Sequence, residues 1–368
     1  MHEPENQPQE IRQALSSRKL ILPVALGLAA AGWLLWSGMD DEVRDPETGG
    51  MTTMRQLLGG FAWSRRATWA LVGVVGCVVI RDLAYIVRLR ILSLRAFKWR
   101  QAFDSIMLWE LASALTPSII GGSAVAILIL RREGMPVGRS VATVFVTALM
   151  DELFYILSVP VVMLVVAAQG GQIFPAIEGL AVWGGASVPL LFGVAYGLIC
   201  VLTTLIVFGV LVAPRWTRRN VGRIFAIWPL RRWAGAAGGW ADDMVVASDA
   251  LKGAGGRMWA GAMGATVASW LARFFTLNMI LLIFLEAVPH AEVLARQLVM
   301  WVVLMISPTP GSAGFAEVAL PAFLGDVVGL GYLAVVAVIW RLATYFPYLF
   351  VGSVVLPGWL SRTKSRTR

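Results

Sequence analysis

The sequence predicts an all-α polytopic membrane protein, with about six full transmembrane helices and two oppositely oriented re-entrant hairpins built from broken helices. Of the 368 residues, 58% are hydrophobic and only 14% are charged, and the mean hydropathy is +0.73. A soluble domain is nearer half apolar and a quarter charged. Several apolar runs reach the roughly 20 residues that cross a bilayer, and two others are interrupted by proline and glycine.

The net charge of +9 is interpreted as a membrane feature. Lysine and arginine gather in loops and at the C-terminus, as in cytoplasmic loops beside anionic lipid. We therefore expect anionic lipid at these loops and no nucleic acid as a partner. The two cysteines, Cys77 and Cys200, lie inside apolar runs, while His2 and His290 lie near the terminus and in a short loop. This usage predicts no disulfide, no metal and no other cofactor.

Hydropathy and loop charge give the first elements. Residues 1–19 are a predicted cytoplasmic tail, and residues 20–37 an uncleaved first span, because the following SGMDDE lacks a small-residue cleavage pattern. A polar loop at 38–66 precedes a second span at 67–89. The next segment is basic and should be cytoplasmic. Its charged residues are Arg88, Arg90, Arg95, Lys98 and Arg100.

The apolar segment at 101–130 has basic flanks on both sides, so it should enter the membrane and return. Its centre, ALTPSIIGGSA, contains Thr116-Pro117 and Gly121-Gly122, which allow two half-helices of roughly 12 residues to meet at a turn. Irregular backbone at membrane depth is tolerated only in a protein interior or beside a wet cavity. We predict a re-entrant hairpin open to the cytoplasm.

The next spans are predicted at 140–168 and 186–212, joined by a weakly charged outer loop. Residues 214–256, the most basic stretch, are expected to form a cytoplasmic connector with amphipathic helices on the leaflet. A solvated positive loop is the simpler interpretation of the same charges. A further span at 258–285 then crosses to the outside.

The stretch SPTPGSAGFAE, residues 307–317, breaks the following apolar run with prolines, glycines and a carboxylate. The flanking half-helices, 297–306 and 315–324, are predicted to form a second re-entrant hairpin that enters from outside. Only this path lets the final span, 332–356, end inside, where the basic tail 359–368 is expected.

The two breaks share the pattern T-P-x-x-x-G and lie about half a chain apart. Together with their opposite entry sides, the pattern predicts an inverted repeat, in which transporters place broken helices near the midplane. The two tips are then the expected substrate-binding site. Their residues are Thr116, Pro117, Gly121, Gly122, Thr309, Pro310, Gly311, Ser312 and Gly314.

Eight ionisable residues lie inside predicted spans or half-helices: Arg81, Asp82, Glu110, Asp151, Glu152, Arg273, Glu317 and Arg341. Charges inside a membrane are expensive, so they normally face a bundle interior and pair. In a structural interpretation, Arg341 or Arg273 neutralises a carboxylate such as Asp151 or Glu317. Arg81 and Asp82 are expected to pair locally, and Trp340 and Tyr345 to serve packing.

A functional interpretation uses the same charges. Half-helix N-termini bind phosphate well, and Arg273 and Arg341 would complete a substrate-binding phosphate site. Glu317 and Asp151 could meet a cationic headgroup or carry a proton. Glu110 and Glu152 are further candidates for a proton or charge-pair role.

The motif P-T-P-G-S-A-G-F-A-E, from Pro308 to Glu317, closely resembles a signature of the lysylphosphatidylglycerol synthase transmembrane family. The first hairpin, with its basic RREGMP loop, and the R-x-x-T-Y pattern of Arg341 to Tyr345 resemble further parts of that family. The resemblance covers residues 20–358, as one flippase-like domain. Departures are Ser312, where a second glycine is common, and Ile119-Ile120.

The resemblance implies lipid translocation, of a phospholipid or a related anionic or aminoacylated lipid, across the cytoplasmic membrane of a bacterium. Both termini are then expected in the cytoplasm. The synthase members carry a soluble acyltransferase-like domain after the membrane part, whereas this sequence ends at Arg368. We therefore expect a transporter and no lipid aminoacylation.

Two alternatives stay open. An intramembrane polyprenyl-phosphate phosphatase or lipid-headgroup transferase is one, because PGSAG loosely resembles the P-G-x-S-R-S-G loop of isoprenyl diphosphatases. Ala313 stands where that loop has arginine, and Ser312 has no nearby histidine to activate it. The other is a subunit that scaffolds an envelope-lipid enzyme. A homo-oligomer is also open.

Overall fold

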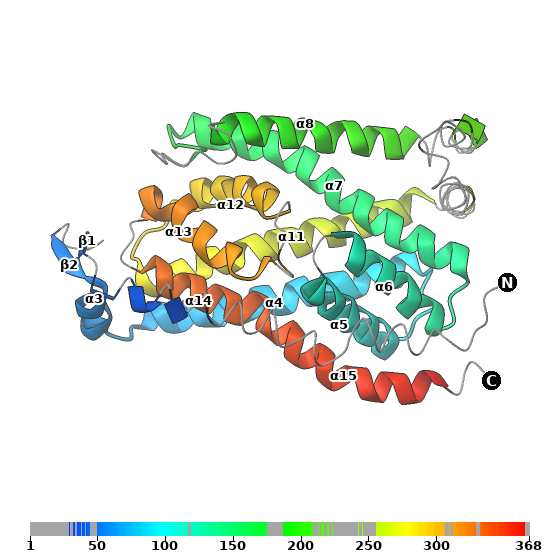
Figure 1. The fold of residues 1–368 in the computed structure, drawn as a ribbon, viewed down its shortest axis with the longest axis horizontal. Helices are drawn as coiled ribbons and strands as arrows, with labels where there is room; N and C mark the ends of the chain where they lie inside the picture. The colour runs from blue at the N-terminus through cyan, green and yellow to red at the C-terminus, as the bar shows by residue number, and fades with distance from the viewer. Residues whose placement is uncertain are drawn as a thin grey trace.

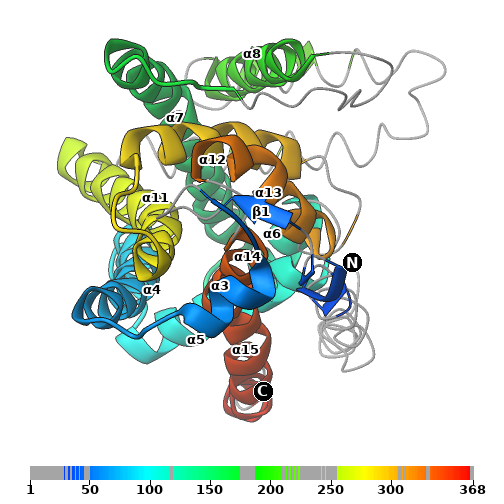
Figure 2. The ribbon, with the colours of Figure 1, turned by 90° about the vertical axis from the view of Figure 1, so that its left-hand side faces the viewer.

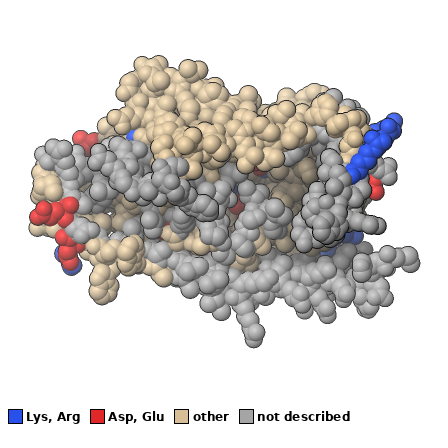
Figure 3. Space-filling view, turned by 45° about the horizontal axis from the view of Figure 1, so that its top comes forward, with Lys and Arg blue, Asp and Glu red and all other residues tan. Residues whose placement is uncertain are grey.

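The computed structural model describes residues 50–116, 119–174, 187–208, 255–305, 312–328 and 332–364, together with Thr309 and isolated positions within 29–44 and 213–245. The described chain is an elongated helical bundle, with the longer helices running roughly along its long axis (Figure 1). In Figure 3 the charged side chains of the described residues lie mainly at the two ends of the face, and the other described residues in this view are mostly uncharged. This distribution suits a bundle that crosses a membrane.

Five described stretches are long and apolar enough to cross a membrane. They are α4 (Arg65–Leu92), α7 (Val137–Ala168), α8 (Val188–Val207), α11 (Gly256–Phe284), and α14 (Leu333–Thr344) with α15 (Phe346–Lys364). They confirm the all-α polytopic fold and the spans predicted at 67–89, 140–168, 186–212, 258–285 and 332–356. Most of the first predicted span, 20–37, lies outside the described residues, as does most of the connector 214–256.

Helices α4 and α11 lie side by side and run in opposite directions (Figures 1 and 2). Small buried side chains recur on one face of α4, at Ala67, Ala70 and Val74, and let the partner helix approach closely. Leu277 and Ile280 of α11 are fully buried in the same core. Helix α8 lies on the outside of the bundle, beside α7 (Figure 2).

Two pairs of shorter helices lie at opposite ends of the bundle (Figure 1). The pair α5 (Trp99–Leu115) and α6 (Ile119–Arg132) is at one end, and the pair α12 (His290–Met305) and α13 (Phe315–Val328) is at the other. At 1.5 Å per residue these helices are about 20–26 Å long, less than the hydrocarbon thickness of about 30 Å. Each half of the chain thus contains a long helix, then a pair of short helices, and then another long span.

The first pair turns earlier than the sequence predicted. Helix α6 begins at Ile119, so Gly121 and Gly122 lie in a helix and do not form the turn. The glycine at 122 instead permits close packing, because a Cβ atom there would lie 2.4 Å from the Ser113 Oγ of α5. Pro117, which the sequence places between α5 and α6, lies outside the described residues.

The second break uses left-handed backbone. Ser312 has a φ of 53° and Gly314 a φ of 82°, and the Ser312 N–H donates to the Thr309 carbonyl at 3.0 Å. Glycine adopts this conformation freely, whereas other L-residues are strained there. Pro310 and Gly311 lie outside the described residues.

The last span is not the single helix that the sequence predicted. It breaks at Tyr345, whose φ of −127° and ψ of −60° separate α14 from α15. Pro347 follows, and its missing N–H and fixed ring favour a helix start here. Because of the break, α15 leaves the bundle axis and packs against α5 (Figure 1).

The loop predicted at 38–66 contains regular structure. Strands β1 (Glu42–Arg44) and β2 (Met51–Thr53) pair antiparallel, and α3 (Met54–Gly60) follows. The Arg55 Nε donates to the Asp40 Oδ1 at 2.9 Å, and this hydrogen bond lowers the pKa of the exposed Asp40 carboxyl.

Candidate functional site

A cavity of about 380 Å³ lies where the tips of the two short pairs approach each other. Ser113, Thr116 and Ser123 come from the first pair, and Thr309 and Ser312 from the second. Helices α4, α7, α11, α14 and α15 form the remaining walls. The structure therefore brings Thr116, Thr309 and Ser312, all predicted as site residues, to one cavity.

Four arginines of the described chain line this cavity: Arg81, Arg88, Arg273 and Arg341. Arg88, expected in the basic segment at the end of the second span, lies inside α4. Helix α4 continues to Leu92, so Arg88 lies on the same helix face as Arg81, two turns away, and is only 4% exposed. The length of an apolar run underestimates the length of a helix when the last turns of that helix carry buried charged residues.

Three of the four arginines donate hydrogen bonds to carboxylates. Arg81 Nη2 donates to Glu110 Oε2 at 2.7 Å, and this contact is closer than its 3.7 Å ion pair with Asp82. The expected local pairing of Arg81 and Asp82 is therefore secondary. Asp82 also accepts a hydrogen bond at 2.8 Å from the hydroxyl of Tyr348, a cavity-lining residue of α15.

A second ion pair, between Arg88 and Asp151, joins α4 to α7. Arg88 donates through both terminal nitrogens to Asp151, with Nη2 and Oδ2 3.3 Å apart. The Trp270 Nε1–H donates to the same carboxylate at 2.8 Å, and Thr266 accepts from Arg88 at 3.1 Å. Asp151 is thus satisfied by protein donors, which leaves little capacity for a proton or an ammonium group.

Glu317 is fully buried, and no part of it lines the cavity. Its Oε2 accepts from the Gly314 N–H at 2.9 Å, and its Oε1 accepts from the Arg341 Nε at 2.9 Å. The carboxylate therefore caps the N-terminus of α13 and ties it to α14. This geometry matches the structural interpretation of the Arg341–Glu317 pair.

Arg273 and Glu152 differ from these paired groups. The Arg273 guanidinium lies 4.9 Å from the ring centroid of Trp270 and 5.0 Å from that of Trp301, and its contact with Glu110 is 4.0 Å long. Within the described residues it donates no hydrogen bond. Glu152, on the cavity wall, likewise accepts no hydrogen bond from any described residue.

Aromatic side chains complete the walls, and the sequence reasoning missed most of them. The Tyr85 ring centroid lies 4.8 Å from Arg88, 5.3 Å from Arg81 and 6.0 Å from Arg273. The Tyr155 hydroxyl is buried without a hydrogen-bond partner among the described residues. Helical spacing was the available signal, because Arg81, Tyr85 and Arg88 share one helix face, as do Asp151 and Tyr155.

Trp340 and Tyr345, expected to serve packing, are both buried and both line the cavity. The Arg341 guanidinium lies 3.8 Å from the Tyr345 ring centroid, a cation–π distance. The break between α14 and α15 brings this ring to the cavity.

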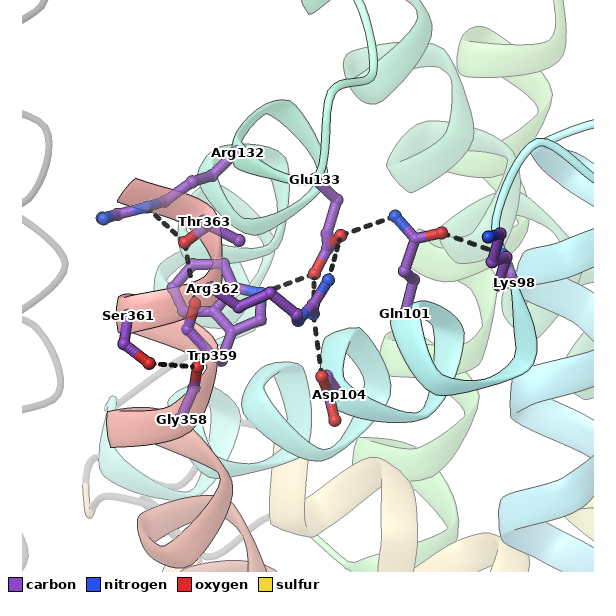
Figure 4. Close-up of polar contacts among 10 residues, drawn as sticks. All are labelled: Lys98, Gln101, Asp104, Arg132, Glu133, Gly358, Trp359, Ser361, Arg362 and Thr363. Carbon is purple, nitrogen blue, oxygen red and sulfur yellow. Dashed lines mark hydrogen bonds and ion pairs between the residues drawn. The ribbon is translucent and has the colours of Figure 1, made fainter. Parts of the chain in front are cut away.

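A second polar cluster lies away from the cavity, where α15 meets the base of the first short pair (Figure 4). The buried Glu133 accepts hydrogen bonds at 2.8 Å from Gln101 and from the Trp359 Nε1–H, and it also pairs with Arg362. Arg362 donates to Asp104 of α5 at 2.8 Å. The residues at 359–364, predicted as tail, thus continue α15 and clamp it to this base.

Comparisons with known proteins agree with the fold. Residues 61–352 match the family described as "Lysylphosphatidylglycerol synthase TM region". A UPF0104 membrane protein of Archaeoglobus fulgidus is 29% identical over 99 residues, which cover 27% of this chain and only 30% of that protein. No solved structure matches the chain. Because the family match spans most of the chain and the described helices are those of a multi-pass membrane protein, this chain belongs to the lysylphosphatidylglycerol synthase TM region family, whose membrane domains are associated with lipid handling.

Proposed function

We propose that this protein moves a phospholipid, or a related anionic or aminoacylated lipid, between the leaflets of the cytoplasmic membrane. The headgroup occupies the cavity while the acyl chains stay in the surrounding lipid. The observation that carries the proposal is the charged cavity between the tips of two short helix pairs that lie at opposite ends of an apolar bundle.

The energetics of buried charge support this proposal. Each ionisable group inside a membrane span costs a few kcal/mol on insertion scales, about 2.5–3.5 for Arg or Asp. Arg81, Arg88, Glu110 and Asp151 are nevertheless gathered around one cavity. A scaffold needs no such group of charges. A transporter does, because it must replace the water that a headgroup loses on leaving the membrane surface.

The short pairs support a path from each side. Both are too short to cross the hydrocarbon, so we propose that they are re-entrant and form an inverted repeat. At the base of the first pair, basic residues are concentrated, as cytoplasmic loops require. They are Arg90, Arg95, Lys98, Arg100, Arg131 and Arg139. We accordingly propose that this end of the bundle and both chain termini lie on the cytoplasmic side, where the basic residues contact anionic lipid.

The phosphatase alternative gains no support from the second tip. The Ser312 Oγ–H donates to the Leu304 carbonyl at 3.1 Å, and a carbonyl cannot act as the general base that a serine nucleophile needs. Movement of the lipid is therefore proposed without chemistry on it.

Filling the cavity tests the proposal. Ala148 of α7 lines the cavity, so Ala148→Trp should block headgroup entry. The matched control is Val161→Trp, which places the same ring on the same helix at a surface position that is 59% exposed. Acyl-labelled fluorescent phospholipids in proteoliposomes would be quenched from outside with dithionite. We expect Ala148→Trp to slow exchange about tenfold, which corresponds to roughly 1.4 kcal/mol of barrier.

Val161→Trp should exchange lipid like the wild type. Equal rates for the wild type, both variants and protein-free vesicles would overturn the proposed function.

A further inference from the structure

The charged residues of the cavity region fall into two sets: three ion pairs with no net charge, and two further charged residues. The pairs Arg81–Glu110, Arg88–Asp151 and Arg341–Glu317 each balance one positive and one negative charge. Among the described cavity residues, this leaves the guanidinium of Arg273 and the carboxylate of Glu152 without hydrogen bonds. Within the described chain, Arg273 keeps only a 4.0 Å ion pair with Glu110, and both groups are half-buried, so each retains hydrogen-bonding capacity for a ligand.

Arg273 and Tyr155 together suit an anion. The Tyr155 and Trp270 ring centroids are 5.1 Å apart, and Arg273 lies 4.9 Å from the same Trp270 ring. Tyr155 is 4% exposed, and its hydroxyl donates to no described residue. Buried donors are almost always satisfied, so an acceptor is expected here. A phosphate oxygen accepts from both a guanidinium and a phenol.

Glu152 suits a cation. It lies one turn before Tyr155 on the cavity face of α7 and can only accept hydrogen bonds when ionised. Its neighbour Asp151 is already occupied by Arg88 and Trp270. The indole faces of Trp270 and Trp301 lie close to Arg273, so they are not open to a quaternary ammonium group. An ammonium group that carries N–H donors fits Glu152 better.

We propose that the cavity selects a zwitterionic glycerophospholipid headgroup of the ethanolamine type, with its phosphate against Arg273 and Tyr155 and its primary ammonium against Glu152. The inference rests on the proposed function and names the substrate class of the same cavity. One positive and one negative charge remain in the site, so a net-neutral, dipolar headgroup complements them, whereas a headgroup with only a phosphate leaves Glu152 unpaired.

The transport arm of the test compares acyl-labelled phosphatidylethanolamine, phosphatidylcholine and phosphatidylglycerol in proteoliposomes. The wild type should move phosphatidylethanolamine about tenfold faster than the other two, which is the size of one hydrogen bond to a charged group. Glu152→Gln should abolish this preference, and Arg273→Gln should slow all three lipids. The matched controls Glu286→Gln and Arg55→Gln change exposed residues outside the cavity and should leave the rates unchanged.

The binding arm uses purified protein in detergent with dihexanoyl forms of the same lipids and with free glycerophosphoethanolamine, measured by microscale thermophoresis. We expect Glu152→Gln to weaken dihexanoyl phosphatidylethanolamine binding about tenfold without weakening phosphatidylglycerol binding. Glycerophosphoethanolamine should bind more weakly than the lipid. Equal affinity for the two would identify a water-soluble ligand and overturn the lipid assignment.

The outcomes separate the two proposals. Lipid exchange without headgroup preference, or a preference that Glu152→Gln leaves intact, would overturn the zwitterion inference and keep the proposed function. Selective binding of phosphatidylethanolamine without any lipid exchange would keep the binding site and overturn the proposed function. A thermal unfolding scan confirms that each variant is folded before either comparison.

Discussion

Glu317 illustrates what one buried carboxylate does in this bundle. Both of its oxygens are used, one by the Gly314 N–H and one by the Arg341 guanidinium, and its side chain is fully buried. A single residue thus caps the second tip and joins it to α14. Removing one member of a buried ion pair leaves the other charge uncompensated.

We therefore predict that Glu317→Ala destabilises the protein by about 3–5 kcal/mol, the loss measured for broken buried pairs. Glu317→Gln should cost less, because its amide oxygen still accepts one hydrogen bond. Thermal unfolding in detergent checks both, with Glu286→Ala at an exposed site as the control. An unchanged melting temperature in Glu317→Ala, combined with lost lipid exchange, would instead assign Glu317 to the headgroup.

At the scale of elements, the first short pair depends on close helix packing. The Cα and Oγ of Ser113 face the backbone of Gly122, at 3.1 Å and 2.4 Å from where a Cβ would stand. The missing side chain lets α5 and α6 approach, as small residues do at membrane helix interfaces. The position of Thr116 and Ser123 on the cavity wall follows from this contact.

Gly122→Ala should therefore separate α5 from α6 and cost about 1–3 kcal/mol, the usual penalty of overpacking. Gly197→Ala in α8, where a Cβ meets nothing within 4 Å, is the matched control and should be neutral or slightly stabilising. Denaturant titration in detergent measures both. Adding Ser113→Ala to Gly122→Ala should recover part of the loss, and the absence of any recovery would mean that this contact does not limit the packing.

For the whole molecule, the arrangement of the two short pairs is the decisive feature. Their bases lie at opposite ends of the bundle, and their tips meet at one cavity (Figure 1). Basic residues are concentrated at the base of the first pair, whereas the other end mixes signs, as in the contacts Asp40–Arg55 and Arg66–Glu286. The positive-inside rule then orients the whole bundle.

Cysteine labelling checks this orientation. In a background with Cys77 and Cys200 changed to serine, Val137→Cys marks the base of the first pair and Glu286→Cys marks the opposite end. We expect a membrane-impermeant maleimide to label position 286 in intact cells, and position 137 only after permeabilisation. Labelling of both positions from one side would contradict the opposite entry of the two pairs.

Much of the architecture could be predicted from sequence, because its signals are local. Hydropathy over about 20 residues located the five described spans, and proline and glycine marked both breaks. The motif that ends at Glu317 identified the family, which the match to residues 61–352 confirms. Local signals failed where one residue type serves two purposes. Glycine at 122 was interpreted as part of a turn, whereas it permits close helix packing. The break at Tyr345 was missed because it lies inside an apolar run.

The sequence by itself determined that this chain is a polytopic membrane protein, roughly where its five described spans lie, and that several of their residues are charged. Only the tertiary structure decided how those charges combine. Arg88 meets Asp151 and Arg81 meets Glu110 across different helices, and no local pattern encodes such distant partners. Helix packing assigns the pairs. Among the described cavity residues it leaves Arg273 and Glu152 without hydrogen bonds, and these two carry the specificity proposed for the cavity.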